Sequence, residues 1–527
     1  MTPTTRGRFT RRDVLRYGAA GALGAGGLAG LALPDAVAQT GRRGGTVRAG
    51  LDTDPRMMDP HRSTLVPDRQ VFQNLYDKLV DTDENLKIVP MLAASWTISP
   101  DGTTYTFKLQ PNVTFHDGTP FNAAAVAYNF DRMRDPKFPS ARRSEIGPIA
   151  SVTAPDPMTA VVKLEQPYSP LLYVLTDRAG MMVSPTAAQK AGLDFALHPV
   201  GTGPFTFVEQ VPQDHVTLQR NPSYWVRGLP YLDQVVYRFL PDDNARVANL
   251  KSGDLEFVAV VPGPQIPQLT AEARQPGARY RLLEHGAFAW TGFWLNTTKP
   301  PFDNKSLRQA FSAAIDRNAI ANAVLQGAAY PAYSFFPNGT PAHDPDWKIP
   351  ARDLPLAREK LRTGGRPNGF SCTLLTYQGQ SNVSVAQAVQ SMVGEAGIQT
   401  QIQVLEAGAL IDTLGRSQYE AGFAGWSGRP DPDFDVYPFM TKSGIPNFNF
   451  AGYVNPQVQD LLDAARVLQN MDQRARAYRE VTKILAEDMP YAWISFAKEY
   501  KLVSVRVRGF VHVPDGLLRL RTVSLAS

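Results

Sequence analysis

The chain has 527 residues, which is too long for one compact core and predicts two to four domains. Hydrophobic residues make up 43% of it, charged residues 20% and aromatic residues 10%, a composition that is ordinary for a globular protein and excludes a disordered one. The formal net charge is +5, and the single cysteine, Cys372, excludes a disulfide within one chain and a thiolate metal cluster.

The first 38 residues predict an export signal. Five arginines and then a charge-free stretch rich in Gly and Ala precede a small-residue cleavage site, Ala-Val-Ala at 36–38. The pair Arg11-Arg12 resembles a twin-arginine signal, whose route exports folded proteins. A membrane anchor is the alternative, but the stretch is short and its glycines disfavour a spanning helix. The signal holds five Arg and two Asp, so the net charge of the rest of the chain is near +2. This low charge gives no indication of nucleic-acid binding. After export, the protein is expected in the periplasm.

Strands and helices alternate along the first half of the chain. Hydrophobic periodicity predicts a strand at 46–51, a helix with apolar residues from Val71 to Val80, a strand at 105–109, a helix after Asn122 as N-cap and a strand near 158–167. A hairpin is expected between 205 and 218, with its turn at 212–214. The strand–helix–strand order of 235–261 favours a parallel crossover unit.

The second half opens with a strand at 287–295. Two helices follow, one from Lys305 to an end at Gly327 and one from Val383 to an end at Gly397, then an alternating strand and a helical pair at 458–490. A basic, β-rich tail begins after Lys501. The pattern predicts a mixed α/β protein with blocks near 44–280 and 284–499 and no flexible linker between them.

One short stretch, FAGWSGRPDPDFD from Phe423 to Asp435, concentrates Gly, Pro and charged residues around Trp426. This density of Gly and Pro predicts a shaped loop instead of a regular helix or central strand. Two interpretations remain open for it, a solvated surface turn and the wall of a ligand site.

Catalytic motifs are not found in the sequence. It contains no His-Glu-x-x-His, no phosphate-binding loop and no Gly-x-Ser-x-Gly, and the glycine before Ser427 falls one place early for a nucleophile turn. The seven histidines are isolated along the chain, so each is expected to be structural or superficial. We therefore expect no catalytic residue, no metal ligand and no cofactor.

A binding protein needs aromatic walls, a few charges and two lobes that close. The second half supplies aromatic candidates at Trp290, Tyr377 and Trp426. Strand alternation at 287–295 places Trp290 and Gly292 on one face and Phe293 and Leu295 on the other, and one of these faces is expected to be core.

Six ordered blocks together resemble the family 5 extracytoplasmic solute-binding proteins of ABC transporters. They include GGTVRAGLDTDPRMMDPHRS near the start, GTGPFTFVEQVPQDHVTLQRNPSYW in the middle, and NTTKPPFDNKSLRQAFSAAIDRNAI, AGWSGRPDPD and YREVTKILAEDMPY later. The resemblance covers about 44–500. It implies two α/β lobes joined by a two-strand hinge, with lobe one at 44–283 and 500–527, an extra α/β domain inserted in it at about 81–199, and lobe two at 284–499.

In peptide-binding members of that family, an Asp in the loop after the Gly-Trp pair holds the amino group of the peptide. Here Arg429 stands at that position by count from Trp426, which favours a carboxylate or phosphate over an ammonium. Asp431 or Asp433 would supply an amine site if the loop shifts, or Asp431 pairs with Arg429 and holds the loop. The candidate ligand-binding residues are Arg429, Trp426, Asp431, Tyr377, Trp290, Met57 and Arg56.

The resemblance implies a periplasmic protein, expected to be monomeric, that delivers a peptide-like, anionic or zwitterionic solute to an ABC permease in the inner membrane without catalysis. The alternative is a secreted protein that is exported folded because it carries a metal or cofactor. That class includes a hydrolase, a redox enzyme, or a haem or metal-chelate carrier that would use residues such as Met57, Met58 and His61.

Overall fold

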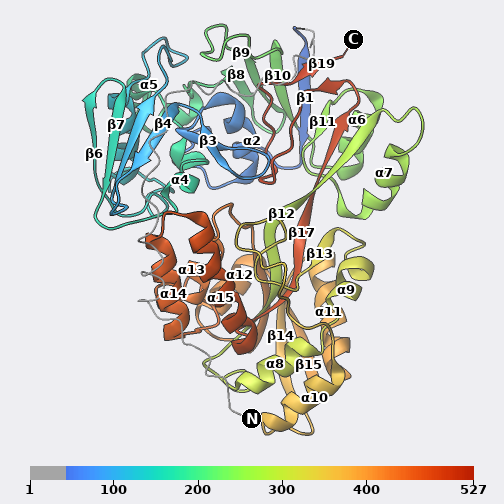
Figure 1. Ribbon diagram of the computed structural model, residues 1–527. Helices are drawn as coiled ribbons and strands as arrows, with labels where there is room; N and C mark the ends of the chain where they lie inside the picture. The colour runs from blue at the N-terminus through green and yellow to red at the C-terminus, as the bar shows by residue number, and fades with distance from the viewer. Residues whose placement is uncertain (1–42, 527) are drawn as a thin grey trace.

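The computed structural model describes residues 43–526, so the predicted signal at 1–38 lies outside the described residues. The chain forms two lobes, one above the other, with long strands β12 (Tyr280–Leu295) and β17 (Tyr491–Ser504) running from one to the other (Figure 1). These two strands pair antiparallel, and the register shifts between Gly286 and Trp290. The predicted mixed α/β class is confirmed.

The strands around β1 form the lobe-one part of an 11-stranded sheet that continues through β17 and β12 into lobe two. Val47, Ala49 and Leu51 of β1 are buried in the core of lobe one. The strands of this part are β1 (Thr46–Leu51), β8 (Phe205–Val211), β9 (His215–Arg220), β10 (Gln234–Phe239) and β11 (Phe257–Val258). The same part of the chain forms the helices α2 (Val66–Leu75), α6 (Asp243–Ser252) and α7 (Ile266–Ala273) and the 3₁₀ turn η4 (Gly263–Gln265). β1 pairs in parallel with β10 and β11, and β8 pairs antiparallel with β9. The predicted crossover unit and hairpin are both confirmed.

A second sheet lies at one side of lobe one, with the strand order β4-β5-β7-β6 (Figure 1). This part contains β2 (Val80–Thr82), β3 (Ile88–Pro90), β4 (Ala93–Ile98), β5 (Thr104–Leu109), α3 (Ala123–Arg134), β6 (Ile149–Asp156), β7 (Thr159–Leu164), α4 (Leu171–Val174), η2 (Arg178–Gly180), α5 (Pro185–Ala191) and η3 (Gly192–Leu197). Asn122 caps α3 through a hydrogen bond from the Ala125 amide, as predicted. The sheet encloses a core of its own, which includes Tyr105, Phe107 and Val162.

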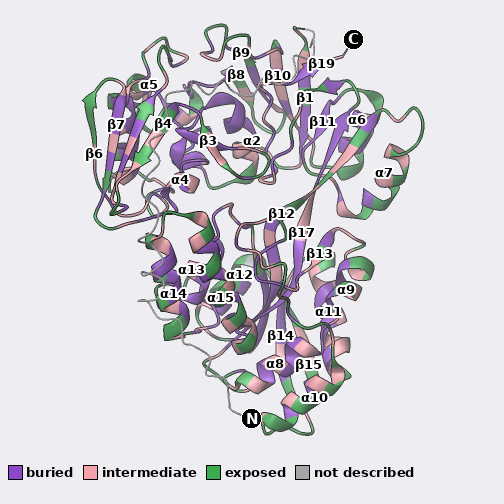
Figure 2. Ribbon diagram, viewed as in Figure 1, coloured by how far each residue is buried: buried purple, intermediate pink, exposed green. Residues whose placement is uncertain are grey.

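Lobe two surrounds the other half of β12 and β17. It contains α8 (Lys305–Ala313), α9 (Arg317–Ala319), the π-helical turn η5 (Ile320–Val324), β13 (Ala329–Pro331), α10 (Leu354–Thr363), β14 (Phe370–Tyr377), α11 (Gln380–Gly394), β15 (Ile398–Leu405), α12 (Ala407–Gly415), β16 (Ala421–Trp426), α13 (Asp433–Met440), η6 (Lys442–Gly444), α14 (Pro456–Val467) and α15 (Met471–Asp488). The tail adds β18 (Val507–Arg508) and β19 (Ser524–Leu525). β1 and β17 are largely buried, whereas β6, α7 and α10 show exposed residues (Figure 2).

Two predicted elements differ from the structure. The single helix expected from Lys305 to Gly327 is interrupted after α8, because the Asp316 side chain accepts a hydrogen bond from the Ala319 amide and starts a new helix as its N-cap. The stretch from Phe423 to Asp435 is a loop only in its middle. Its first residues form β16, which lies between β14 and β12 in the sheet, and its last ones begin α13.

Candidate ligand site between the lobes

A cavity of about 270 Å³ lies where the two lobes face each other. Lobe one contributes residues of α2, α4 and the segments that flank α4, and lobe two contributes the loop after β16 together with α13 and α14. Its charged and aromatic lining residues are Arg69, Glu145, Tyr168, Tyr173, Asp177, Trp426, Arg429, Asp431, Phe434, Phe448, Arg466 and Asp515. The volume is at the lower end of the range for small-molecule sites, so the cavity suits a small solute.

The loop after β16 presents Arg429 to this cavity. Gly428 has a φ of +70°, and a β-carbon there would lie 2.1 Å from the Cβ of Phe288, so the turn requires glycine. The amide of Arg429 then donates to Asp435 at 3.0 Å, which fixes the residue after the turn. The Arg429 guanidinium lies 4.8 Å from the centre of the Trp426 ring and donates to Ser427 and to the Gly428 carbonyl.

Arg429 has no salt bridge to any carboxylate within residues 43–526. Burial lowers its pKa from the usual value, and the guanidinium of Arg69 lowers it further, while Asp177 and Glu145 raise it. The cavity therefore contains a half-buried guanidinium that forms no salt bridge within residues 43–526, although Asp177 and Glu145 act on it electrostatically.

Asp431 and Asp433 are both occupied by other arginines. Both oxygens of Asp431 accept from Arg474, at 2.7 and 2.6 Å, and Asp433 accepts from Arg466 at 2.8 to 3.1 Å. Both aspartates are 0% exposed. The alternative in which Asp431 pairs with Arg429 is wrong, because Arg474 binds both oxygens of that carboxylate. For the same reason, the structure does not support Asp431 as a ligand contact or either aspartate as an amine site.

The wall contributed by lobe one carries an ion pair. Nε of Arg69 donates to Oδ1 of Asp177 at 3.2 Å, and Nη2 of Arg69 lies 3.1 Å from Oδ2 in a salt bridge. Nε of Arg178 lies 3.9 Å from the same carboxylate. Burial raises the pKa of Asp177, but Arg69, followed by Arg178 and Arg429, lowers it below its usual value. Arg429 therefore acts electrostatically on Asp177 although the two residues belong to different lobes.

Trp290 is not on a ligand wall. It is 1% exposed, and its ring packs against Trp294, Phe439 and Tyr491 in the core of lobe two. Both faces of this part of β12 are buried, because Phe293 is also 0% exposed. The prediction of Trp290 as a ligand contact is corrected to a core residue.

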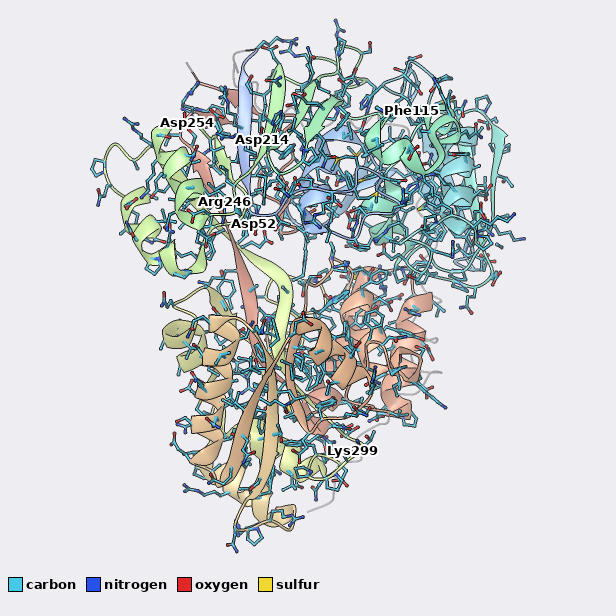
Figure 3. All side chains as sticks on the ribbon, turned by 180° about the vertical axis from the view of Figure 1, so that it is seen from behind. Asp52, Phe115, Asp214, Arg246, Asp254 and Lys299 are labelled. Carbon is cyan, nitrogen blue, oxygen red and sulfur yellow. The ribbon has the colours of Figure 1, made fainter. Side chains whose placement is uncertain are left out.

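The remaining predicted residues lie outside this cavity. Tyr377 ends β14 and stacks on Phe423, with ring centres 6.3 Å apart, without lining the cavity. Arg56 lines a separate groove with residues 207–213, and the Met57 amide lies 3.4 Å from Asp68. Figure 3 shows Asp52, just after β1, at the edge of lobe one that faces lobe two, so the loop with Arg56 starts at that edge.

The comparisons with known proteins agree with this geometry. The model of bacterial extracellular solute-binding proteins, family 5 Middle, matches residues 87–447. The chain belongs to this family. The glutathione-binding protein GsiB of Escherichia coli (strain K12) is 33% identical to this family 5 protein over 470 residues, which cover 87% of this chain and 90% of GsiB.

Two solved structures share the whole fold. DppA of Helicobacter pylori, an ABC transporter-associated periplasmic binding protein in complex with the peptide STSA, is 28% identical, with a TM-score of 0.76 over 92% of this chain and 98% of DppA. AgaA of Agrobacterium tumefaciens R10, in complex with agropinic acid, is 26% identical, with a TM-score of 0.75 over 92% of this chain and 99% of AgaA. This family 5 protein is accordingly a solute-binding protein with the two-lobed fold and not an enzyme.

The lobes of this family 5 protein also meet away from the hinge strands. The backbone amide of Ser169 donates to the Arg466 carbonyl at 2.8 Å, and the Ser169 hydroxyl donates to the Ala465 carbonyl at 3.3 Å. These carbonyls belong to the last turn of α14, where helical partners run out. Tyr105 adds a hydrogen bond to Gln469 at 3.2 Å. Lobe one thus caps a helix of lobe two beside the cavity.

Two further observations concern metals and membranes. Within residues 43–526, no group of three or more His, Cys, Asp and Glu side chains is arranged to hold a metal ion. His61 is buried, with its ring nitrogens hydrogen-bonded to the Met181 carbonyl and to Arg132. No helix in the same range has the length and apolarity needed to cross a membrane.

Sequence reasoning missed Arg69 and Asp177. Arg69 is one polar residue within α2, and Asp177 stands three residues after the short helix α4. Neither position belongs to a motif, and the two meet only because the chain folds 108 residues back onto itself. No local signal in the sequence identifies them.

Proposed function

We propose that this protein captures a small peptide-like, anionic or zwitterionic solute in the cavity between its lobes and delivers it to an ABC permease in the inner membrane. The observation that carries the proposal is the Arg429 guanidinium, which lines the cavity and forms no salt bridge with a carboxylate of residues 43–526. A carboxylate of the solute supplies the missing counterion, and the Trp426 ring beneath the guanidinium offers an apolar contact.

An ammonium at this position is disfavoured. At 4 Å, two positive charges repel each other by about 4 kcal/mol at the effective dielectric constant of a protein surface. Asp431, the nearby carboxylate that could offset this repulsion, is bound to Arg474. Glutathione, the peptide STSA and agropinic acid, which the names of GsiB, DppA and AgaA give as their ligands, all carry at least one carboxylate. Their shared chemistry supports an acid as the solute.

The proposal includes how the protein is built and where it acts. Lobe one (44–283 and 500–527, with the inserted domain at about 81–199) and lobe two (284–499) enclose the solute by bending at β12 and β17. The protein acts in the periplasm as a monomer after twin-arginine export and cleavage near Ala38. Support comes from the two-strand connection, the cavity lined by both lobes and the charge pattern of the N-terminus.

Thermal unfolding of the mature protein against a panel of peptides and organic acids tests the proposal. We expect at least one carboxylate-bearing compound to raise the melting temperature, because a ligand that binds only the folded state stabilises it. Arg429→Asp should weaken the binding of that compound at least tenfold, which is about 1.4 kcal/mol of binding free energy. Trp426→Ala should weaken its binding as well. The matched control Arg366→Asp changes an exposed arginine of lobe two and should leave the affinity unchanged. A panel without any shift, or equal affinity for Arg429→Asp, would contradict the proposal.

A further inference from the structure

The inserted domain proposed above contacts lobe two at the C-terminal end of α14. Ser169 donates its backbone amide and its hydroxyl to carbonyls in the last turn of that helix, at 2.8 and 3.3 Å. Just beyond the helix, the Gln469 side chain accepts a hydrogen bond from Tyr105 at 3.2 Å. The amide nitrogen of Gln469 also lies against Gly102, where a β-carbon would be only 2.8 Å away. Two separate segments of the inserted domain, at 102–105 and at Ser169, therefore hold this helix end.

An aromatic side chain makes a second contact between the same two parts. Phe434, in the first turn of α13, packs against the core of the inserted domain and also lines the cavity. Its neighbour Asp433 accepts from Arg466 of α14 at 2.8 to 3.1 Å, and the Arg466 guanidinium lies 5.7 Å from the centre of the Tyr168 ring. α13 and α14 thus meet the inserted domain as one surface, at the end of the loop that carries Arg429.

The chemistry of these contacts is that of a surface that can open and close. The carbonyls at the end of α14 lack helical partners, so water replaces Ser169 when the two surfaces separate. Gln469 is exposed and Phe434 is half-buried, so both side chains can face water as well. Figure 1 shows α13 and α14 below α4, to one side of β12 and β17. When lobes bend about hinge strands, contacts away from the hinge form and break with closure.

We propose that the inserted domain is a latch for the cavity: it docks onto Phe434 and the C-terminal end of α14, holds the lobes together even without a solute, and slows the release of a bound solute. Ser169 and Gln469 are outside the cavity lining and act on it as positioning residues, through α14. The role in release rests on the function proposed above, whereas the docking itself is independent of the solute.

Distances between two spin labels measure the docking in mature protein from which small molecules have been removed by dialysis. Thr153 of the inserted domain and Asp460 of α14 are exposed and accept the labels after replacement by Cys, while the native thiol of Cys372 is buried. The labelled protein without further changes should show a population at the distance of the docked arrangement. Ser169→Ala combined with Gln469→Ala should lower the ratio of docked to undocked molecules about fivefold, because two hydrogen bonds between the lobes are lost.

Two other variants frame this result. Phe434→Ala should lower the same ratio at least fivefold, because an apolar contact between the lobes is lost. The matched control, Ser252→Ala combined with Gln399→Ala, replaces an exposed serine of α6 and an exposed glutamine of β15 and should leave the ratio unchanged.

The absence of the docked distance before any latch residue is changed would overturn the proposal, and so would an unchanged ratio after Ser169→Ala with Gln469→Ala. This double variant decides the question if Phe434→Ala does not fold, since it only shortens side chains at the contact. The measurement uses no solute, so a failed latch leaves Arg429-dependent binding of an acid intact. Loss of that binding with an intact latch would instead reject the proposed function.

Discussion

The buried pair of Asp431 and Arg474 should hold the binding loop in place, and its removal is the sharpest stability test. Asp431 is 0% exposed, and the Arg474 side chain is 2% exposed. Replacing Asp431 by Ala removes two charge-assisted hydrogen bonds, to Nη1 and Nη2, and leaves Arg474 as an uncompensated buried charge. Breaking one side of a buried pair costs about 3–5 kcal/mol. For a cooperative unit of about 150–250 residues, that cost lowers the melting temperature by about 6–20 °C.

Calorimetry on a double-mutant cycle distinguishes this account from ordinary damage to the core. Arg474→Met should also destabilise, but Asp431→Ala combined with Arg474→Met should cost about 2 kcal/mol less than the sum of the single variants, because no unpaired charge remains. Asp431→Ala should also weaken binding of the solute, since Arg429 lies two residues before the anchored carboxylate. A loss below about 1 kcal/mol for Asp431→Ala, or additive single effects, would refute the reasoning.

Three further predictions concern the loop, a buried histidine and the second groove. Gly428→Ala should destabilise the protein by more than the roughly 1 kcal/mol expected for Gly118→Ala. Both glycines have a positive φ, but only at Gly428 would the added β-carbon also clash with Phe288. Denaturant midpoints compare the two variants, and equal losses of stability would contradict the clash. Burial lowers the pKa of His61 to about 3, while the unfolded side chain titrates near 6.5, so the unfolded state takes up the proton first as the pH falls. Below about pH 6.5, the unfolding free energy of wild type should therefore fall by about 1.4 kcal/mol per pH unit relative to that of His61→Gln. Urea unfolding of both proteins at pH 7.5, 6.5 and 5.5 measures this, and a difference between them that stays constant with pH would refute it. Arg56→Gln should change the solute affinity less than twofold in titration calorimetry, since this residue lines a different groove, and a tenfold loss would place it in the site.

Much of the fold follows from local patterns. Alternation predicted β1, and the strand–helix–strand order predicted the parallel unit of β10, α6 and β11, because both signals depend on neighbouring residues. Glycine and proline counts were less reliable at Phe423 to Asp435. The prolines begin only after Trp426, and Gly425 packs against the Trp290 carbonyl, so the start of this stretch continues as an inner strand. Close packing between strands is not visible in a linear count.

The site was predictable only on the side of lobe two. Arg429 stood out because it occupies a position defined by the Gly-Trp pair, and it does line the cavity. The partner of Asp431 was not predictable, since Arg474 lies 43 residues away on α15 and local reasoning favoured the neighbouring Arg429. Trp290 illustrates the opposite error, because an aromatic strand residue is equally compatible with a ligand wall and with a core.

The central claim is that Arg429 holds a carboxylate of the solute, and mass spectrometry of the small molecules released from periplasmic protein tests it most directly. Wild type should release a stoichiometric compound with at least one carboxylate, and the Arg429→Asp protein, purified in parallel, should release at most a tenth as much. A neutral or cationic compound, a metal chelate or haem, or equal amounts from both proteins would contradict the account.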